Sequence, residues 1–264
     1  MRAKATVFAA AALAGVLLSA PALAAEKIVA FAAAARAGSA GPTTPLRGYL
    51  MKPAGAGPFP AVVLLHTCLG LPANRRAIES ELTQWGYAAL FVDDFSTRGL
   101  KETCAVDFPE GVADAYGALA FLAGQPFVDP ARIAAIGYSQ GADTALTLAS
   151  GRVPAPYAAR KGLAFRAAAA FYPPCANQGG AAMRIPTLIF VGQGDEVTPA
   201  ADCEALARSQ TGTVALHVYP GAPHGFDNPE FAAGKLVLGM RLAYDRAAAG
   251  KASAELRRFL EANL

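Results

Sequence analysis

Short apolar runs alternate with amphipathic segments along most of the chain, and this alternation predicts its secondary structure. Six runs are almost entirely apolar, as expected of strands buried on both faces: 61–65, 87–92, 133–137, 167–172, 186–191 and 214–219. Apolar residues recur at helical spacing over 74–85, 109–123, 140–150 and 200–208. Strands that alternate with helices predict an α/β fold with a mostly parallel central sheet, of about eight strands, covered by helices on both faces.

The two ends of the chain depart from this alternation. Two short strands, 26–35 and 46–52, are joined by a turn rich in Gly, Ser, Pro and Thr, so we expect an antiparallel pair at one edge of the sheet. The tail, 231–264, is predicted to be helical, with Leu256 and Leu260 on its late apolar face. No internal repeat or linker divides the chain, which favours one domain.

Residues 1–24 have the pattern of a secretory signal peptide. Arg2 and Lys4 precede an apolar stretch over 5–18, and Ala22-Leu23-Ala24 supplies the small residues of a cleavage site. The stretch is shorter than the roughly 20 apolar residues that span a bilayer. We therefore expect cleavage after Ala24, export to the periplasm or beyond, and a single domain over 25–264.

Charge argues against two classes of partner. Removal of Arg2 and Lys4 from the chain's 23 basic residues leaves 21 against 20 acidic residues, so the formal net charge falls from +3 to +1. No basic patch favours nucleic acid, and no later segment is apolar enough to span a membrane. No CxxC motif or cluster of Cys and His indicates a metal site.

A serine directly follows one predicted strand. The strand 133–137 runs into Gly137-Tyr138-Ser139-Gln140-Gly141, where the helix 140–150 begins at once. Two glycines permit so tight a turn, because side chains there would collide where strand and helix nearly touch. The turn would hold the Ser139 hydroxyl above the sheet edge. We interpret Ser139 as a nucleophile, with a structural turn serine as the alternative.

A serine nucleophile needs a base, and histidine is the side chain whose pKa lies nearest the working pH. The chain has three histidines. His224 lies in the loop after the last strand, and we expect it to be the base. His66 follows a buried strand, where it is either the base or a brace for its loop. His217 lies within a strand and is interpreted as a partly exposed sheet residue.

The histidine in turn needs a carboxylate that fixes its tautomer. Asp195 follows the strand 186–191 and a flexible Gly192-Gln193-Gly194, and it is the candidate we favour. Glu196 is adjacent and could serve instead. Asp143 lies in the helix that carries the nucleophile, which favours a solvated or capping role.

Two backbone N–H groups are expected to bind the oxyanion of an acyl-transfer reaction. One belongs to Gln140, the residue after the nucleophile. The other belongs to the loop after the strand 61–65, where position favours Cys68, with an ordinary connecting loop as the alternative. An apolar pocket is expected beside them, lined by Phe95, Tyr138, Tyr172 and Phe226.

The order Ser139, Asp195, His224, each just after a strand, is the chain order of α/β-hydrolases. With its flanking motifs, the chain resembles the dienelactone hydrolase-like family of the α/β-hydrolase fold. The resemblance implies an almost lidless core with a Cys or Ser nucleophile that acts on esters or lactones without a metal or cofactor. The motifs are His66-Thr67-Cys68-Leu69-Gly70, Asp94-Phe95-Ser96-Thr97-Arg98-Gly99, Asp114-Ala115-Tyr116, Gly137-Tyr138-Ser139-Gln140-Gly141, Gly194-Asp195 with Pro199, and Tyr219-Pro220-Gly221-Ala222-Pro223-His224-Gly225-Phe226.

Three positions depart from the pattern of the family's namesake members. Ser139 stands where those members carry a cysteine, and Thr67 stands where they carry a glutamate. Asn228 stands near one of the two arginines with which they bind a substrate carboxylate. We therefore expect the family's fold and catalytic triad here, but not the dienelactone substrate.

Arg98, Tyr138 and Phe226 are candidates to contact the substrate. Arg98 matches the other arginine of the family, so it either binds an acidic substrate group or braces its loop through an ion pair with Asp93 or Asp94.

The four cysteines are an even number in a chain expected to be exported. Their positions after strands that are neighbours in this fold imply two disulfides, Cys68–Cys104 and Cys175–Cys203. Free cysteines packed as small apolar residues are the alternative.

These observations favour an exported serine hydrolase that cleaves small-molecule esters or lactones. One alternative is a serine peptidase of the prolyl-oligopeptidase type, although those peptidases usually carry an additional domain. The other is a secreted binding protein on an inactive hydrolase fold, against which the complete triad argues. The acyl and alcohol groups and the oligomeric state are left open by the sequence.

Overall fold

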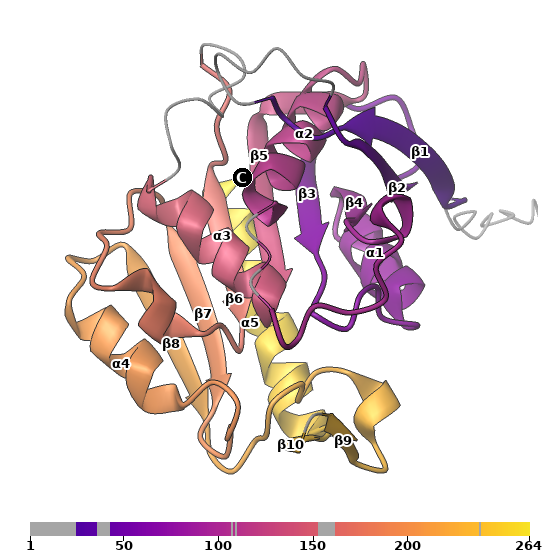
Figure 1. Ribbon diagram of the computed structural model, residues 1–264. Helices are drawn as coiled ribbons and strands as arrows, with labels where there is room; N and C mark the ends of the chain where they lie inside the picture. The colour runs from indigo at the N-terminus through magenta and orange to yellow at the C-terminus, as the bar shows by residue number, and fades with distance from the viewer. Residues whose placement is uncertain (1–24, 36–42, 107, 109, 153–161, 238) are drawn as a thin grey trace, which may run out of the picture.

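An eight-stranded sheet runs through the centre of the computed structural model, which describes residues 25–35, 43–106, 108, 110–152, 162–237 and 239–264 (Figure 1). The strand order is β1-β2-β4-β3-β5-β6-β7-β8. The strands are β1 Lys27–Ala32, β2 Pro45–Met51, β3 Phe59–Leu65, β4 Ala88–Asp93, β5 Val128–Tyr138, β6 Ala167–Phe171, β7 Thr187–Gly192 and β8 Val214–Tyr219. β1 and β2 pair antiparallel, and all pairs from β4 to β8 are parallel, which confirms the predicted fold and its antiparallel edge.

Helices cover both faces of the sheet. The helices are α1 Arg75–Gln84, α2 Gly111–Ala123, α3 Gln140–Ser150, α4 Ala200–Arg208 and α5 Arg246–Asn263, with 3₁₀ turns η1 Ser96–Arg98, η3 Cys175–Gln178 and η4 Pro229–Phe231. Leu82 of α1 and Leu256 of α5 pack on the face that presents Val62 and Leu64. Leu119 of α2 packs on the opposite face, as do the apolar residues of α3 and α4. Residues alternate between the two faces along β3, as the pleat requires.

The tail is only partly helical, and here the sequence prediction is wrong. Between 231 and 245 the chain forms a short antiparallel hairpin, with strands β9 Lys235–Val237 and β10 Met240–Leu242. Gly234 and Gly239 have φ of 73° and 80°, a backbone conformation that interrupts a helix. The helix begins only after Asp245, whose carboxylate accepts the N–H groups of Ala247 and Ala248 as an N-cap.

The expected signal peptide, residues 1–24, lies outside the described residues. Within the part of the chain that is described, no helix is both long and apolar enough to cross a membrane.

Candidate active site

The turn between β5 and α3 has the tight geometry expected from its two glycines. Ser139 has φ of 52° and ψ of −112°, a conformation that non-glycine residues rarely adopt. A Cβ atom on Gly137 would run into the carbonyl of Gly141. A Cβ on Gly141 would in turn run into the carbonyls of Leu65 and His66. The glycines thus allow α3 to begin close against the end of β3 and hold the strained serine between them.

Ser139, His224 and Asp195 form one chain of hydrogen bonds. The Ser139 hydroxyl lies 3.0 Å from Nε2 of His224, and Nδ1 of His224 lies 2.8 Å from Oδ2 of Asp195. Only 6% of His224 and 5% of Asp195 are exposed. A proton on Nδ1, donated to the carboxylate, leaves Nε2 free to accept the hydroxyl proton. The arrangement can therefore activate the serine for attack on a carbonyl.

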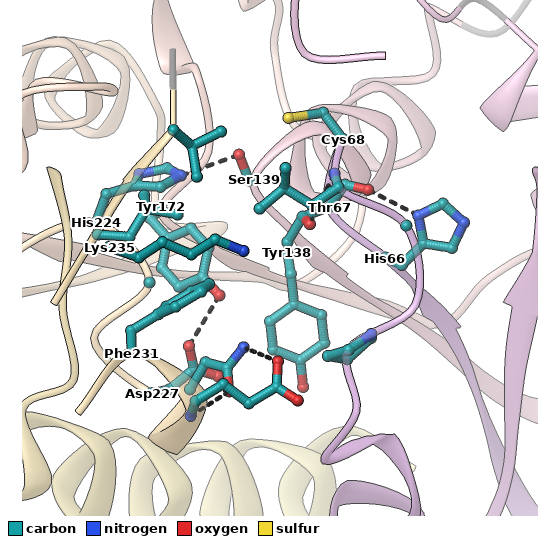
Figure 2. Close-up of a pocket in the computed structure, with 18 of the residues that line it drawn as sticks. His66, Thr67, Cys68, Tyr138, Ser139, Tyr172, His224, Asp227, Phe231 and Lys235 are labelled. Atoms are coloured by element: carbon teal, nitrogen blue, oxygen red, sulfur yellow. Dashed lines mark hydrogen bonds between the residues drawn. The ribbon is translucent and has the colours of Figure 1, made fainter. Parts of the chain in front are cut away.

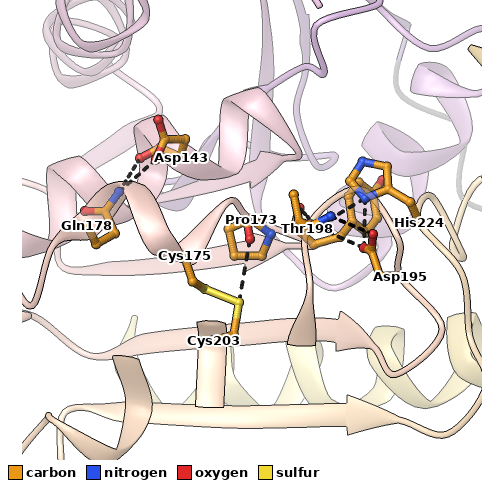
Figure 3. Close-up of a disulfide and its surroundings, with 9 residues drawn as sticks. Asp143, Pro173, Cys175, Gln178, Asp195, Thr198, Cys203 and His224 are labelled. Atoms are coloured by element: carbon orange, nitrogen blue, oxygen red, sulfur yellow. Dashed lines mark hydrogen bonds and ion pairs between the residues drawn. A yellow bond between two sulfur atoms is a disulfide. The ribbon is translucent and has the colours of Figure 1, made fainter. Parts of the chain in front are cut away.

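Thr198 supports this chain of hydrogen bonds, a role that no sequence motif indicated. Its hydroxyl lies 2.9 Å from Oδ2 of Asp195, and its N–H and that of Val197 donate to Oδ1 at 2.8 and 2.9 Å. These donors fix the Asp195 carboxylate beneath the imidazole. Figure 3 shows this group beside the Cys175–Cys203 disulfide.

The alternative base and carboxylates lie elsewhere. Glu196 is exposed, and Asp143 accepts a 2.9 Å hydrogen bond from the side chain of Gln178. His217 is half-buried on β8, 4.0 Å from Glu255. His66 takes the loop-bracing position: its Nδ1 lies 2.8 Å from the Thr67 carbonyl, and the Asp94 N–H points to its Nε2 at 3.4 Å.

His66 orients the peptide bond that carries the N–H of Cys68, one of the two expected oxyanion donors. Burial lowers the pKa of His66, which favours a neutral ring that donates from Nδ1 to the Thr67 carbonyl. The Gly70 N–H donates to the same carbonyl at 3.0 Å. The C=O and N–H of one trans peptide point in opposite directions. The N–H of Cys68 therefore points away from His66, toward Ser139 in Figure 2.

Gln140, whose N–H is the other expected donor, lies at the first position of α3. Among the backbone hydrogen bonds of the described residues, none is donated by the N–H of Gln140 or of Cys68. Gln140 directly follows the nucleophile in the chain, and Cys68 lines the same cavity as Ser139.

A cavity of about 300 Å³ opens beside the Ser139 hydroxyl. Both Ser139 and His224 line it, together with Cys68 and Tyr138. Its apolar lining includes Leu69, Leu71, Ile78, Val197, Met240 and Leu242. A cavity of this volume suits a small substrate rather than a long lipid chain.

The hairpin contributes a wall of the cavity that sequence reasoning missed. Lys235 of β9 and Met240 of β10 line it, and Figure 2 shows the Lys235 side chain reaching across the cavity. The described residues of the 231–245 segment therefore form part of the cavity wall, a contribution that the family resemblance, which implied an almost lidless core, did not predict. Because we expected this segment to be helical, we did not predict that it would line the cavity.

Opposite the serine, the cavity has a polar end. The Tyr172 hydroxyl donates a 2.8 Å hydrogen bond to Oδ1 of Asp227. Burial raises the pKa of Asp227 to about 6, and the hydrogen bond from Tyr172 acts against this rise. The Tyr172 ring also packs edge-on against His224, with centroids 4.6 Å apart. Tyr172 thus contacts both His224 and the polar end of the cavity.

Two of the three candidate substrate contacts lie away from the cavity lining. The Arg98 guanidinium lies 2.8 Å from Oδ2 of Asp114, and it donates to the backbone carbonyl of Asp94 at 2.6 Å. The Asp114 carboxylate is fully buried, and burial raises its pKa to about 7, an effect that the hydrogen bond from Arg98 opposes. Arg98 therefore takes the loop-bracing role, with Asp114 in place of the expected aspartates. Phe226 is fully buried in the core, whereas Tyr138 does line the cavity.

Phe95 is also a buried residue rather than a cavity wall. It packs edge-on against the ring of His66, with centroids 4.5 Å apart. Of the four aromatic residues expected in the pocket, Tyr138 and Tyr172 line it.

Both expected disulfides are present. Cys68 is bonded to Cys104 and Cys175 to Cys203, with Cα–Cα distances of 4.8 and 5.0 Å. Cys68 lies in the loop after β3, so the first disulfide ties the expected oxyanion loop to the segment that follows η1. Within the described residues, no group of three or more His, Cys, Asp or Glu side chains is arranged to hold a metal ion.

Comparisons with known proteins bear on the family and the fold of this chain. A model of the dienelactone hydrolase family matches residues 46–264. Two proteins of Mycobacterium tuberculosis, from strains CDC 1551 and H37Rv and both described as uncharacterized, are each 30% identical over 207 residues. The match covers 73% of this chain and 72% of theirs.

Two solved structures illustrate the similarity of the fold. One is the dienelactone hydrolase-like promiscuous phosphotriesterase P91 from metagenomic libraries, with a TM-score of 0.68 and 21% identity over 89% of this chain and 98% of that one. The other is an esterase of the planctomycete Thermogutta terrifontis, with a TM-score of 0.59 and 21% identity over 81% and 87% of the two chains.

Proposed function

Because the chain belongs to the dienelactone hydrolase family and is a carboxylic ester hydrolase, we propose that it cleaves esters or lactones through an acyl-enzyme formed on Ser139. The observation that carries the proposal is the unbroken chain of hydrogen bonds from Ser139 through His224 to Asp195. All three groups lie at the carboxyl ends of parallel strands, where such folds bind their ligands.

In the first half-reaction, the Ser139 oxygen attacks the carbonyl carbon while Nε2 of His224 takes its proton. Asp195 stabilises the imidazolium that forms. The carbonyl oxygen becomes an oxyanion that accepts the N–H groups of Cys68 and Gln140. When this intermediate collapses, the bond to the alcohol oxygen breaks and His224 returns the proton to the leaving alkoxide.

In the second half-reaction, water replaces the alcohol. His224 takes a proton from the water as it attacks the acyl carbon, and the oxyanion again binds the same two N–H groups. Collapse breaks the bond to the Ser139 oxygen, which recovers its proton from His224. A lactone would follow the same steps, with the alcohol still joined to the acyl group.

The cavity supports a small, mainly apolar substrate with one polar substituent. Its volume is about 300 Å³, its walls include Leu69 and Met240, and its far end holds Tyr172 and Asp227. Tyr138 also lines the cavity, and we assign it a substrate contact.

We further propose that the enzyme acts outside the cytoplasm as a single domain over 25–264. The signal pattern over 1–24 and the two disulfides support export, because disulfides form and persist in oxidising compartments.

The direct test is hydrolysis of p-nitrophenyl acetate and butyrate by the chain from residue 25 onward. Ser139→Ala should lower kcat by about 10⁴-fold or more, because no other group replaces the nucleophile. Ser209→Ala, which removes a hydroxyl bonded to a carbonyl of α4, is the matched control and should retain activity. Ester hydrolysis that survives Ser139→Ala would overturn the proposal.

A further inference from the structure

Thr103 contacts both residues whose N–H groups we assign to the oxyanion, Cys68 and Gln140, and its neighbour Cys104 contacts Cys68. The Thr103 N–H donates a 2.9 Å hydrogen bond to the Cys68 carbonyl, and its hydroxyl donates at 2.8 Å to Oε1 of Gln140. Cys104 forms the disulfide with Cys68. Thr103 is buried, with 4% of its surface exposed, and it is not among the residues that line the cavity. It therefore reaches the site only through its neighbours.

The two N–H groups need such a connection, because they come from separate elements. Cys68 belongs to a loop after β3, and Gln140 begins α3. Both donors must converge on one oxygen, and catalytic groups tolerate errors of only about 0.5 Å. His66 and Gly70 hold the peptide that carries the Cys68 N–H, because both contact the Thr67 carbonyl of that peptide. Thr103 donates to the Cys68 carbonyl of the same loop and to the Gln140 side chain, so it links the loop to the start of α3.

We propose that Thr103 is a positioning residue that holds the two oxyanion donors at their working separation. The inference rests on the proposed function, since it assigns Thr103 a part in the oxyanion hole of that reaction. The oxyanion exists only in the transition state and the tetrahedral intermediate, whereas the ground-state ester makes little use of the donors. Loss of Thr103 should therefore lower kcat and leave KM almost unchanged.

The test compares Thr103→Val and Thr103→Ser with wild type on p-nitrophenyl butyrate. Valine keeps the shape and the backbone N–H but removes the hydroxyl, so kcat should fall about 10-fold, less than the 10²–10³ of losing a donor outright. Binding of an aryl boronic acid, which mimics the tetrahedral intermediate, should weaken by a similar factor. Serine keeps the hydroxyl and should restore both quantities.

The matched control is Thr187→Val, which removes an equally buried hydroxyl bonded to the Ile185 carbonyl at the opposite end of the sheet. It should leave kcat within about 2-fold of wild type. Gln140→Ala removes the acceptor but keeps the N–H, so it should reproduce the Thr103→Val phenotype. The double variant should be no worse than either single variant, because all three break one interaction.

A Thr103→Val enzyme with wild-type kcat, a rise in KM alone, or additive effects in the double variant would overturn the inference. Should Thr103→Val fail to fold, Gln140→Ala alone decides by the same kcat and boronate measurements. These failures are distinct from failure of the proposed function, which would show as activity that persists in Ser139→Ala.

Discussion

Glu79 is a fully buried carboxyl group on α1 that lies within hydrogen-bonding reach of the Glu26 carboxyl group. Burial, together with the neighbouring Glu26, raises its pKa from 4.5 to about 9. The folded protein therefore binds this proton more tightly than the unfolded chain does. The free energy of unfolding should fall as pH rises from about 4.5 to about 9. In this range the unfolded chain has lost the proton, so folding must take one up from solution.

Glu79→Gln keeps the size of the side chain and stays neutral at every pH. We expect the melting temperature of the variant, relative to wild type, to rise steadily from about pH 5 to about pH 9. Glu81→Gln, at an exposed position of the same helix, is the control and should show no such trend. A difference between Glu79→Gln and wild type that is independent of pH would contradict the shifted pKa.

Single residues could be predicted where a local rule constrains them. Ser139 follows from the two glycines beside it, and His224 and Asp195 follow from their places after predicted strands. Thr198 and Thr103 could not be found in this way, because each acts through a loop conformation that leaves no periodic pattern. Arg98 was found but its partner was not, since the choice of Asp114 depends on how η1 packs against α2.

At the scale of elements, the two disulfides have similar geometry but different surroundings. They close loops with sequence separations of 36 and 28, so each should stabilise the fold by about 2–4 kcal/mol. Only Cys68–Cys104 joins the loop that carries an oxyanion donor.

We expect Cys68→Ser/Cys104→Ser and Cys175→Ser/Cys203→Ser to lower the melting temperature by comparable amounts. The first double variant should also lose about 10-fold in kcat, because the oxyanion loop is released, while the second should keep wild-type kcat at temperatures where it is folded. Steady-state kinetics beside thermal unfolding separates the two effects. Equal kcat values for the two double variants would show that the first disulfide serves stability alone.

The β9–β10 hairpin offers a second element-scale prediction, on substrate size. Met240 lines the cavity, whereas Leu236 of the same hairpin is 73% exposed and points away from it. Met240→Ala should enlarge the cavity and raise kcat/KM for hexanoate relative to acetate p-nitrophenyl esters, by about 10-fold, the effect of one or two methylene groups. Leu236→Ala should leave the ratio unchanged. An unchanged ratio in Met240→Ala would remove the hairpin from the substrate site.

Elements with a clear hydrophobic period were predicted with their observed bounds, as α3, α4 and β8 show. The hairpin was not, because its strands are three residues long and too short to display a period of two. Gly234 and Gly239, which lie on either side of β9, were the sequence features that indicated a break in the helix. The prediction followed instead the apolar residues at helical spacing further along the tail.

At the scale of the whole molecule, the alternation of strands and helices accounts for the location of the site. Parallel strands bring their carboxyl ends to one edge of the sheet, so the segments after β3, β5, β7 and β8 meet there. Residues far apart in the sequence are thereby assembled into one hydrogen-bonded chain. The choice of substrate could not be predicted at this scale, because it depends on the hairpin and on loop side chains.

The central claim is that Ser139 forms a covalent intermediate, and active-site labelling tests it most directly. The chain from residue 25 onward would be treated with a fluorophosphonate, and the adduct would be mapped by peptide mass spectrometry. The account predicts one adduct per chain, on Ser139, which is absent in Ser139→Ala and formed far more slowly in His224→Ala. No adduct on the wild-type protein, or an adduct on another residue that Ser139→Ala retains, would contradict it.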